Sequence, residues 1–582
     1  MSRRYLPVAL ALVLFGLPLF IGLGRSDMDN DEAIYSYSVE RMLALHDWLT
    51  PRAIYDGADD PFLEKPPLKT WIVAAGQLAG LPRDEFGLRF FDPLFAIAGF
   101  AYVFALGRRL AGALCGIVAV FVLLTFQPLV FEHGLRSNNM ESAMLLMYCG
   151  GIYHFLRWTE EDRRVGRRHA WACAGYFAFG FLAKFVAAAF LPIVMAAALL
   201  WRRDAASKIR EAAAEWVWPA VAALAAIAPW FVYQGALRGR AFWNEVVGHQ
   251  VFTRFTSFLD PNHLRPWHYY FVELWKGLAQ SGDAMLAAIG LAWLVIHAWR
   301  GRPPLVRILL LWWIVPFALI SLGTSKLIHY MYPFIPPIAL GAGAAAAAWM
   351  DFWNARSRPW QPRWALQYLP AALSLALLLI ALWTAQTGPL AWKIDGLRVL
   401  RTTTAIRPLM LGVLALCAAG SIRMAIRVVA VVALAAALPI PAYAAELRRL
   451  GDAHLPLHSI RDCISGEPGG FHAAGRGVTG PGWMIAGHSF FYYFRSLGPY
   501  HATEEDGELR TRMFTPALHT PVILDKRRIA YLQAGNASLP WEFLSAVDLG
   551  AFVVVLPGPY ESCTAAAVAA GGQRFEFARA QR

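Results

Sequence analysis

The residues best suited to chemistry lie in one polar stretch of this sequence, from Asp27 to Arg89, which separates two apolar segments. Asp31 falls at the start of an expected helix, where the helix dipole favours an ionised carboxylate. An ionised carboxylate near lipid can act as a general base toward a lipid-borne hydroxyl. The alternative is that Asp31 and its acidic neighbours only solvate the loop and cap the helix.

The same stretch places an acid and a base side by side at Glu64 and Lys65. Pro66 and Pro67 follow, and because proline fixes the backbone, the two charged side chains are held rigidly. A lysine beside a membrane suits the binding of a phosphate group. The alternative is a turn with a local ion pair.

A third acid, Glu141, stands at the outer end of an expected membrane span, shortly after Arg136. An acid in that place is costly unless it faces a cavity or a charged partner. Glu141 is therefore a candidate site residue, and the alternative is an ion pair between Glu141 and Arg136.

Two later stretches could complete a site. The first, from His263 to Tyr270, combines histidine, arginine and aromatic side chains, and His263 with Glu64 could hold a metal ion. Two ligands are too few to define a metal site, and aromatic side chains at a membrane are often interfacial anchors. The second contains Lys326, which snorkelling to the bilayer edge explains as well as phosphate binding does.

The elements that must position these residues are membrane helices. Of the 582 residues, 57% are hydrophobic and only 16% are charged, and long apolar runs recur along the chain. This pattern predicts a polytopic α-helical membrane protein. The net charge is +13, but Arg and Lys cluster in short loops between apolar runs, which indicates cytoplasmic loops and no nucleic-acid partner.

The apolar runs predict about 13 membrane-spanning helices within residues 1–445. The basic turns alternate along the chain, which places loops 27–89 and 234–267 and the turn around Lys326 together on the external face. The expected spans are Tyr5–Leu23, Phe90–Leu106, Gly112–Phe131, Met140–Phe155, Ala170–Phe185, Leu191–Trp201, Trp216–Tyr233, Met285–Trp299, Leu305–Leu322, Tyr330–Met350, Leu366–Trp383, Leu409–Ala419 and Val428–Ala444.

One helix in the first loop is expected to lie along the membrane rather than across it. Asn30 can cap a helix that starts at Asp31. An apolar stripe with helical spacing favours an amphipathic juxtamembrane helix in the membrane interface. The stripe consists of Tyr35, Val39, Met42 and Leu43.

The tail, residues 446–582, differs from the rest of the chain because glycine and proline interrupt it often. Short β-like runs at Pro521–Leu524 and Ala551–Leu556 predict a small mixed α/β domain on the external side. Cys463 and Cys563 could pair in an oxidising compartment, although their spacing alone does not establish a disulfide.

The order of these motifs resembles the first periplasmic loop of the aminoarabinose transferase and protein mannosyltransferase families, which are GT-C glycosyltransferases. The resemblance covers Tyr5 to Met350 well and the later spans and tail only in layout. The matching motifs are Asp31-Glu32-x-x-Tyr35, Asp47-Trp48, Pro51, Phe62-x-Glu64-Lys65-Pro66-Pro67-Leu68, Trp71, Arg89, His263-x-x-Pro266-x-x-Tyr269 and Ser325-Lys326-Leu327-x-x-Tyr330-x-x-Pro333.

The resemblance implies an enzyme of the bacterial inner membrane whose active site faces the periplasm. The donor would be a polyprenyl-phosphate sugar, and the acceptor lipid A or another envelope glycan. By resemblance, Asp31 is the catalytic base and Glu141 a second catalytic acid. The donor phosphate would be bound by Lys65, Arg265, Lys326 and Tyr330.

The resemblance also assigns supporting roles. Glu32, Tyr35 and Arg89 would hold the loop, and a divalent metal such as zinc would bind Glu64 and His263, with no other cofactor required. Aminoarabinose transferases usually have Asp at the position of Glu141, whereas mannosyltransferases have Glu. That departure, together with Ile34 where an arginine is common, leaves the sugar and the acceptor open.

The expected chemistry is a single displacement with inversion, in which Asp31 takes the proton of the acceptor hydroxyl and the cations stabilise the departing phosphate. A protein O-mannosyltransferase is an alternative within the same class. A polyprenyl-lipid flippase is an alternative from another class, although it would need acids deep within its spans, and here the acids gather at the external ends. A third alternative is a non-catalytic membrane scaffold that presents the tail domain.

Overall fold

The computed structural model describes most of the chain. The expected last span, Val428–Ala444, and most of the first, Tyr5–Leu23, lie outside the described residues. The described residues are 16–26, 28, 30–55, 58–202, 204–258, 263–300, 304–356, 364–388, 390–394, 397–402, 405–419, 456–464, 471–474, 492–493, 500–503, 506–536, 538–549, 552–570 and 572–577.

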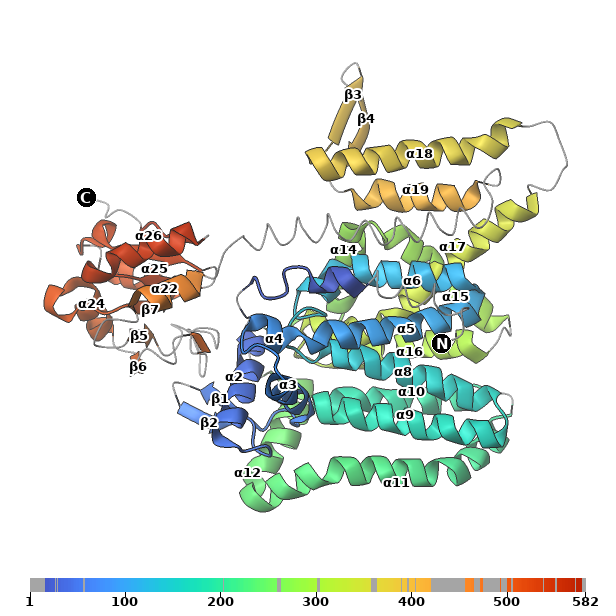
Figure 1. Cartoon of the computed structure of the whole chain (residues 1–582), viewed down its shortest axis with the longest axis horizontal. Coiled ribbons are helices and arrows are strands. Elements are labelled where there is room, and N and C mark those ends of the chain that lie inside the picture. The colour runs from blue at the N-terminus through green and yellow to red at the C-terminus, as the bar shows by residue number, and fades with distance from the viewer. Residues whose placement is uncertain are drawn as a thin grey trace.

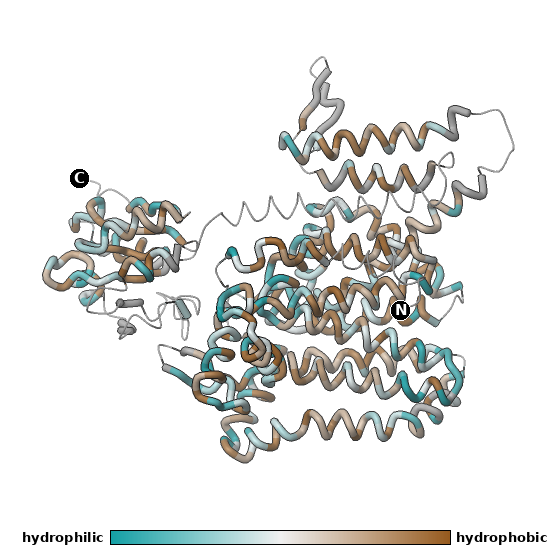
Figure 2. Tube along the Cα trace, viewed as in Figure 1, coloured by the Kyte–Doolittle hydropathy of each residue, from teal (hydrophilic) through white to brown (hydrophobic). Residues whose placement is uncertain are grey.

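Long helices that lie side by side form the body of the protein (Figure 1). Their middle portions are apolar and their ends are more polar, as expected for helices in a bilayer (Figure 2). The helices are α5 (Phe91–Ala111), α6 (Ala113–Thr125), α8 (Glu141–Glu160), α9 (Arg163–Lys184), α10 (Phe190–Leu200), α11 (Ala205–Arg238), α14 (Tyr269–Ser281), α15 (Ala284–Trp299), α16 (Pro304–Leu322), α17 (Pro336–Arg356), α18 (Trp364–Thr387) and α19 (Ile406–Ala418).

Several of these helices can cross a membrane. Within the described part of the chain, five are long and apolar enough, or up to six if one bent pair is a single span. The multi-pass prediction therefore agrees with the structure, and the number of about 13 spans stays a prediction. The five are Glu85–Ala111, Arg164–Leu200, Ala213–Arg238, Pro304–Leu322 and Tyr368–Thr387.

Two runs that the sequence analysis took as continuous spans are broken by proline. The run Tyr330–Met350 divides into the 3₁₀ helix η5 (Ile328–Phe334) and α17, which are bent by 51°. The run Gly112–Phe131 divides into α6 and α7 (Gln127–Phe131). Proline lacks an N–H and suits the first turn of a helix, so α7, with Pro128 in its first turn, and α17, which begins at Pro336, start new helices instead of continuing the preceding ones.

Glycine lets the central helices approach closely. A Cβ added at Gly343 of α17 would collide with the backbone of Cys115 in α6, and one at Gly290 of α15 would collide with the backbone of Ala342. Small residues at such crossings replace side-chain contacts by backbone contacts, which is a common means of packing helices in membranes.

The first polar loop folds into a compact unit at one end of the helices (Figure 1). It contains α2 (Asn30–Leu45), the antiparallel strands β1 (Arg52–Tyr55) and β2 (Ala58–Pro61), α3 (Leu68–Leu78) and α4 (Glu85–Arg89). A second hairpin, β3 (Leu390–Ile394) and β4 (Leu397–Thr402), joins α18 to α19.

The expected helix at Asp31 is present as α2, but its apolar stripe does not face lipid. Tyr35 packs with Phe62 and Met140, and Val39 and Met42 lie in a buried cluster that includes residues of α3. The interpretation of this stripe as a membrane-facing surface is wrong. The hairpin and α3 fold over α2, so protein rather than lipid removes the stripe from water.

A buried ion pair anchors this loop to the helices. Arg89 donates to both carboxylate oxygens of Glu32, at 2.6 and 2.7 Å, and to the backbone carbonyls of Leu23 and Ser26, each at 2.9 Å. Glu32 also accepts the backbone N–H of Asn138 at 2.6 Å. The pair thereby joins the start of α2, the end of α4 and the turn before α8, and it brings together two residues expected to support the loop.

The described part of the tail forms a mixed α/β unit. Its six-stranded sheet has the order β10-β8-β9-β7-β5-β6, with β5 parallel to β6 and β7 and the other pairs antiparallel. The strands are β5 (Phe471–Ala474), β6 (Tyr500–Thr503), β7 (Val522–Asp525), β8 (Ala546–Asp548), β9 (Phe552–Val555) and β10 (Gln573–Arg574). The helices are α22 (Pro456–Ile464), α24 (Asp506–Phe514), α25 (Lys526–Gly535) and α26 (Glu561–Ala569).

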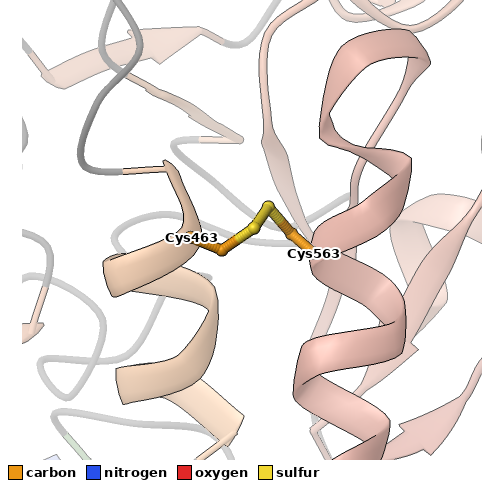
Figure 3. Close-up of a disulfide and its surroundings, with 2 residues drawn as sticks. All are labelled: Cys463 and Cys563. Atoms are coloured by element: carbon orange, nitrogen blue, oxygen red, sulfur yellow. A yellow bond between two sulfur atoms is a disulfide. The ribbon is translucent and has the colours of Figure 1, made fainter.

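A disulfide links two helices within the tail, and hydrogen bonds of Tyr493 connect the tail to the first loop. A disulfide between Cys463 of α22 and Cys563 of α26 closes a loop of 100 residues, with a Cα–Cα distance of 5.6 Å (Figure 3). The hydroxyl of Tyr493 accepts the backbone N–H of Met28 at 3.1 Å and donates to Glu85 at 3.0 Å. The tail therefore contacts the segment that leads into α2.

Replacing Arg89 with methionine would leave the Glu32 carboxylate buried without its cation. We expect a loss of about 3–5 kcal/mol in stability, because an uncompensated buried charge is costly. The measurement is the thermal unfolding midpoint in detergent. The double variant Glu32→Gln/Arg89→Met removes the charge as well and should recover most of the loss. An unchanged midpoint in Arg89→Met would show that the pair does not anchor the loop.

Candidate active site

A cavity of about 370 Å³ lies between the first loop and helices α8, α9, α10, α16 and η5. Its polar end contains Glu64, Lys65, Glu141, Lys184, Arg254, His329 and Tyr330. Its other walls are largely hydrocarbon and include Val186, Phe190, Ile193, Leu319, Ile320 and Phe334. A cavity with one charged end and apolar walls suits an amphiphile with an anionic head group.

Lys65 reaches this cavity from the loop between β2 and α3, as the proline pair predicted. Its Nζ lies 3.7 Å from Glu64, so the local ion pair is present as well. Burial lowers the pKa of Lys65 to about 8, against the opposing effect of Glu64, and the charges of Arg254 and Lys184 lower it further. An anion bound in the cavity would counter this effect and favour the charged lysine.

Helix α3, which follows Lys65 in the chain, is held in place by a buried ion pair. Lys69 of α3 donates to both oxygens of Asp92 in α5, at 2.8 and 2.9 Å, and to the carbonyl of Asn139 at 2.6 Å. Ser142 of α8 donates to the same carboxylate. Because α3, α5 and α8 meet at this pair, the backbone just after Lys65 has little freedom to shift.

Arg254 is the second cation at the cavity. It donates to the hydroxyl of Tyr330 at 2.7 Å, and its guanidinium lies 3.5 Å from Glu64. Arg254 begins the short helix α13 (Arg254–Thr256), directly after the π-helix η3 (Asn244–Thr253). π-helical turns are rare and occur frequently at functional sites.

By resemblance, Arg265 is the expected phosphate-binding arginine, and Arg254 is not among the expected site residues. Arg265 is exposed, its guanidinium lies 5.8 Å from the ring of Tyr269, and it does not line the cavity. The segment 234–267 was read as a polar loop, whereas it begins with the end of α11 and continues through α12 (Arg240–Trp243) into η3. A π-helix has no 3.6-residue pattern, so spacing could not show which arginine faces inward.

Lys184, at the end of α9, is the third cation at the cavity, and it is likewise not among the expected site residues. It donates to Glu141, whose other oxygen accepts the N–H of Met140 at 2.9 Å, and its Nζ lies 5.7 Å over the ring of Tyr330. Glu141 therefore pairs with Lys184, while Arg136 donates to the carbonyl of Ile21. A lone lysine in the apolar run 170–201 was the signal that could have identified it.

Asp31 stands in the first turn of α2, as expected, with 42% of its side chain exposed. His133 Nε2 lies 3.0 Å from its Oδ2. The His133 ring meets the ring of His329 edge to face at 4.2 Å, and His329 Nε2 lies 3.8 Å from Glu141. A row of histidines thus connects the candidate base to the charged end of the cavity.

Lys326 and His263 do not line the cavity. The Nζ of Lys326 is buried and donates to the carbonyls of Arg265 and Gly323, and its backbone N–H donates to the carbonyl of His263. Lys326 therefore joins two turns in the structure instead of facing the cavity. Among the described residues, no three His, Cys, Asp or Glu side chains gather in a way that could hold a metal. The zinc site at Glu64 and His263 stays a prediction.

Known proteins resemble parts of this chain in sequence. Residues 64–233 match the family model described as dolichyl-phosphate-mannose-protein mannosyltransferase. An undecaprenyl phosphate-alpha-4-amino-4-deoxy-L-arabinose arabinosyl transferase of Pseudomonas aeruginosa is 28% identical over 356 residues, which is 59% of this chain and 60% of the relative. A transferase of the same name from Pseudomonas fluorescens is 26% identical over 327 residues, which is 55% of this chain and 54% of the relative. The chain thus matches about 60% or less of the length of these relatives.

Solved structures extend the match. The crystal structure of ArnT from Cupriavidus metallidurans bound to undecaprenyl phosphate has a TM-score of 0.60 at 19% identity, over 96% of this chain and 100% of that one. The archaeal oligosaccharyltransferase AglB from Archaeoglobus fulgidus has a TM-score of 0.51 at 12% identity. That match covers 97% of this chain and 78% of AglB. This chain has the GT-C fold. The GT-C resemblance inferred from the motifs is confirmed, and it includes the later helices that the motifs covered only in layout.

Because the pKa of Lys65 is about 8, this GT-C cavity loses a positive charge as the pH rises through that value. We expect the affinity for dihexyl phosphate, a diester whose own charge is constant, to fall by up to about tenfold from pH 7 to pH 9. Calorimetry in detergent measures it. Lys65→Arg stays charged and should remove the fall. The same fall in Lys65→Arg would assign the titration to another group.

Proposed function

We propose that this protein is an integral-membrane glycosyltransferase that moves a sugar from a polyprenyl-phosphate donor to an acceptor on the periplasmic side of a bacterial inner membrane. The observation that carries the proposal is the cavity in which Lys65, Arg254 and Lys184 meet at one end of apolar walls. A phosphodiester fits the cations, and a polyprenyl chain fits the walls. The relatives named as undecaprenyl phosphate aminoarabinose transferases support this class of donor.

The donor's phosphate would lie against Lys65, Arg254 and Tyr330. A phosphate-linked sugar is already activated, so the protein needs only to orient it and stabilise the charge that develops on the leaving phosphate. Lys184 adds a third positive charge and is held by its pair with Glu141. In this proposal Glu141 acts by holding Lys184 at the cavity.

Asp31 would be the general base. It takes the proton of the acceptor hydroxyl, the hydroxyl oxygen attacks the anomeric carbon, and the bond from that carbon to the phosphate oxygen breaks with inversion. The products are the glycosylated acceptor and the polyprenyl phosphate. The partly exposed carboxylate of Asp31 is accessible to an acceptor that approaches from outside the cavity.

The acceptor we propose is lipid A or another envelope glycan, because the aminoarabinose transferases are the curated relatives. A protein acceptor is the second candidate, and it is favoured by the mannosyltransferase family model over residues 64–233. A flippase would move the donor lipid without forming a new glycosidic bond. The mass of the acceptor therefore separates the transferase from the transporter.

The proposal is tested in a deletion strain complemented with wild type or Asp31→Asn. We expect wild type alone to restore one pentose- or hexose-sized mass on lipid A, and the polyprenyl-phosphate sugar to accumulate with Asp31→Asn, because the variant lacks the base. Mass spectrometry of the two lipid fractions measures both. Equal restoration by both proteins would remove Asp31 as the base. If neither lipid fraction changes, a protein acceptor becomes the leading candidate.

The choice of arginine is tested separately, with a matched control. Arg254→Gln removes a charged hydrogen-bond donor from the phosphate end, so we expect kcat/KM for the donor to fall about 10- to 100-fold. Arg265→Gln changes an exposed arginine outside the cavity and should stay close to wild type. Transfer assays in detergent with a polyprenyl-phosphate sugar measure both. A larger loss in Arg265→Gln than in Arg254→Gln would assign phosphate binding to Arg265 instead.

A further inference from the structure

The contact between Asp31 and His133 joins two distant parts of the first half of the chain. Asp31 lies in the first turn of α2, and His133 follows α7, 102 residues later. The carboxylate is 42% exposed, whereas the imidazole is only 16% exposed. The histidine is therefore the more buried partner, and the acid is the more accessible one.

The backbone around His133 is held in an unusual conformation. His133 has a φ of +58°, a left-handed value that costs a side-chain-bearing residue about 1–2 kcal/mol. The next residue, Gly134, packs so tightly that a Cβ would collide with the carbonyl of Leu129, which also accepts the N–H of Leu135 at 2.9 Å. Strain of this kind persists where the surrounding structure requires one side-chain direction.

The His133 ring also contacts His329, a residue that lines the cavity. The ring meets His329 at 4.2 Å, and His329 approaches Glu141, which is paired with Lys184. His133 thus contacts both the Asp31 carboxylate and the His329 imidazole. Its place between them sets the separation between the proposed base and the phosphate end of the cavity.

We propose that His133 is a positioning residue that orients the Asp31 carboxylate toward the acceptor hydroxyl. The inference rests on the proposed function and deepens it. With its proton on Nε2, the neutral imidazole donates to Asp31 Oδ2 and leaves the other carboxylate oxygen to take the acceptor's proton. His133 itself neither gains nor loses a proton in this step. A carboxylate held in one rotamer loses less entropy in the transition state than a free one.

Two variants separate orientation from folding. Asparagine tolerates a positive φ but is too short to reach Asp31, whereas the amide nitrogen of glutamine can lie where Nε2 lies. We expect His133→Asn to lower kcat about 10- to 100-fold with the donor KM changed less than twofold. His133→Gln should recover to within about tenfold of wild type. A residue that only stabilises the fold would not show this split or this recovery.

A double-mutant cycle completes the test. If His133 acts only through Asp31, His133→Asn should cost nothing further in an Asp31→Asn background, measured by prolonged single-turnover transfer. The positioning role would be overturned if the losses in the two variants were additive. It would also be overturned if His133→Asn kept the wild-type kcat, or if its donor KM rose as much as its kcat fell. Absence of transfer by wild type would overturn the proposed function, and this inference with it.

Discussion

The ion pair between Glu32 and Arg89 is the interaction on which the candidate site depends. Both side chains are buried, and backbone groups from two separate segments, Leu23–Ser26 and Asn138, supply hydrogen bonds that a buried charge requires. Glu32 is the neighbour of Asp31, and Asn138 begins the approach to Glu141. One guanidinium therefore sets the position of the proposed base relative to the helices that form the cavity.

The cavity itself has an excess of positive charge. Lys65, Arg254 and Lys184 face it, while Glu64 and Glu141 are the acids among its lining residues. Burial lowers the pKa of Lys65, and repulsion from the like charges of Arg254 and Lys184 lowers it further. A phosphodiester relieves that repulsion on binding, and it does so further as negative charge develops on the leaving oxygen. In the proposed reaction, this arrangement would stabilise the transition state more than the bound donor, because the leaving oxygen carries more negative charge in the transition state.

Of the expected site residues, Lys65, Glu141 and Tyr330 line the cavity, whereas the other cavity cations and His133, whose places depend on tertiary structure, were not among the expected residues. Lys65 is presented by its prolines and Asp31 by the start of α2, so both lie where local rules place them. Arg254 follows a π-helix, and Lys184 and His133 reach the site only because α8, α9 and the turn after α7 converge there. The stripe on α2 was misread for the same reason, since amphipathic spacing does not tell whether lipid or protein covers it.

The acid at position 141 acquires a different meaning in this setting. From the resemblance alone, the choice between Glu and Asp at this position bears on which sugar is transferred and which acceptor receives it. In the structure the Glu141 carboxylate contacts Lys184, His329 and the N–H of Met140, all of them groups of the protein. In the proposed function, the length of the side chain at position 141 would set where Lys184 is held at the cavity. A change between Asp and Glu there should act on donor phosphate binding, and sugar selectivity should depend on residues nearer Asp31, where the acceptor and the anomeric carbon would meet.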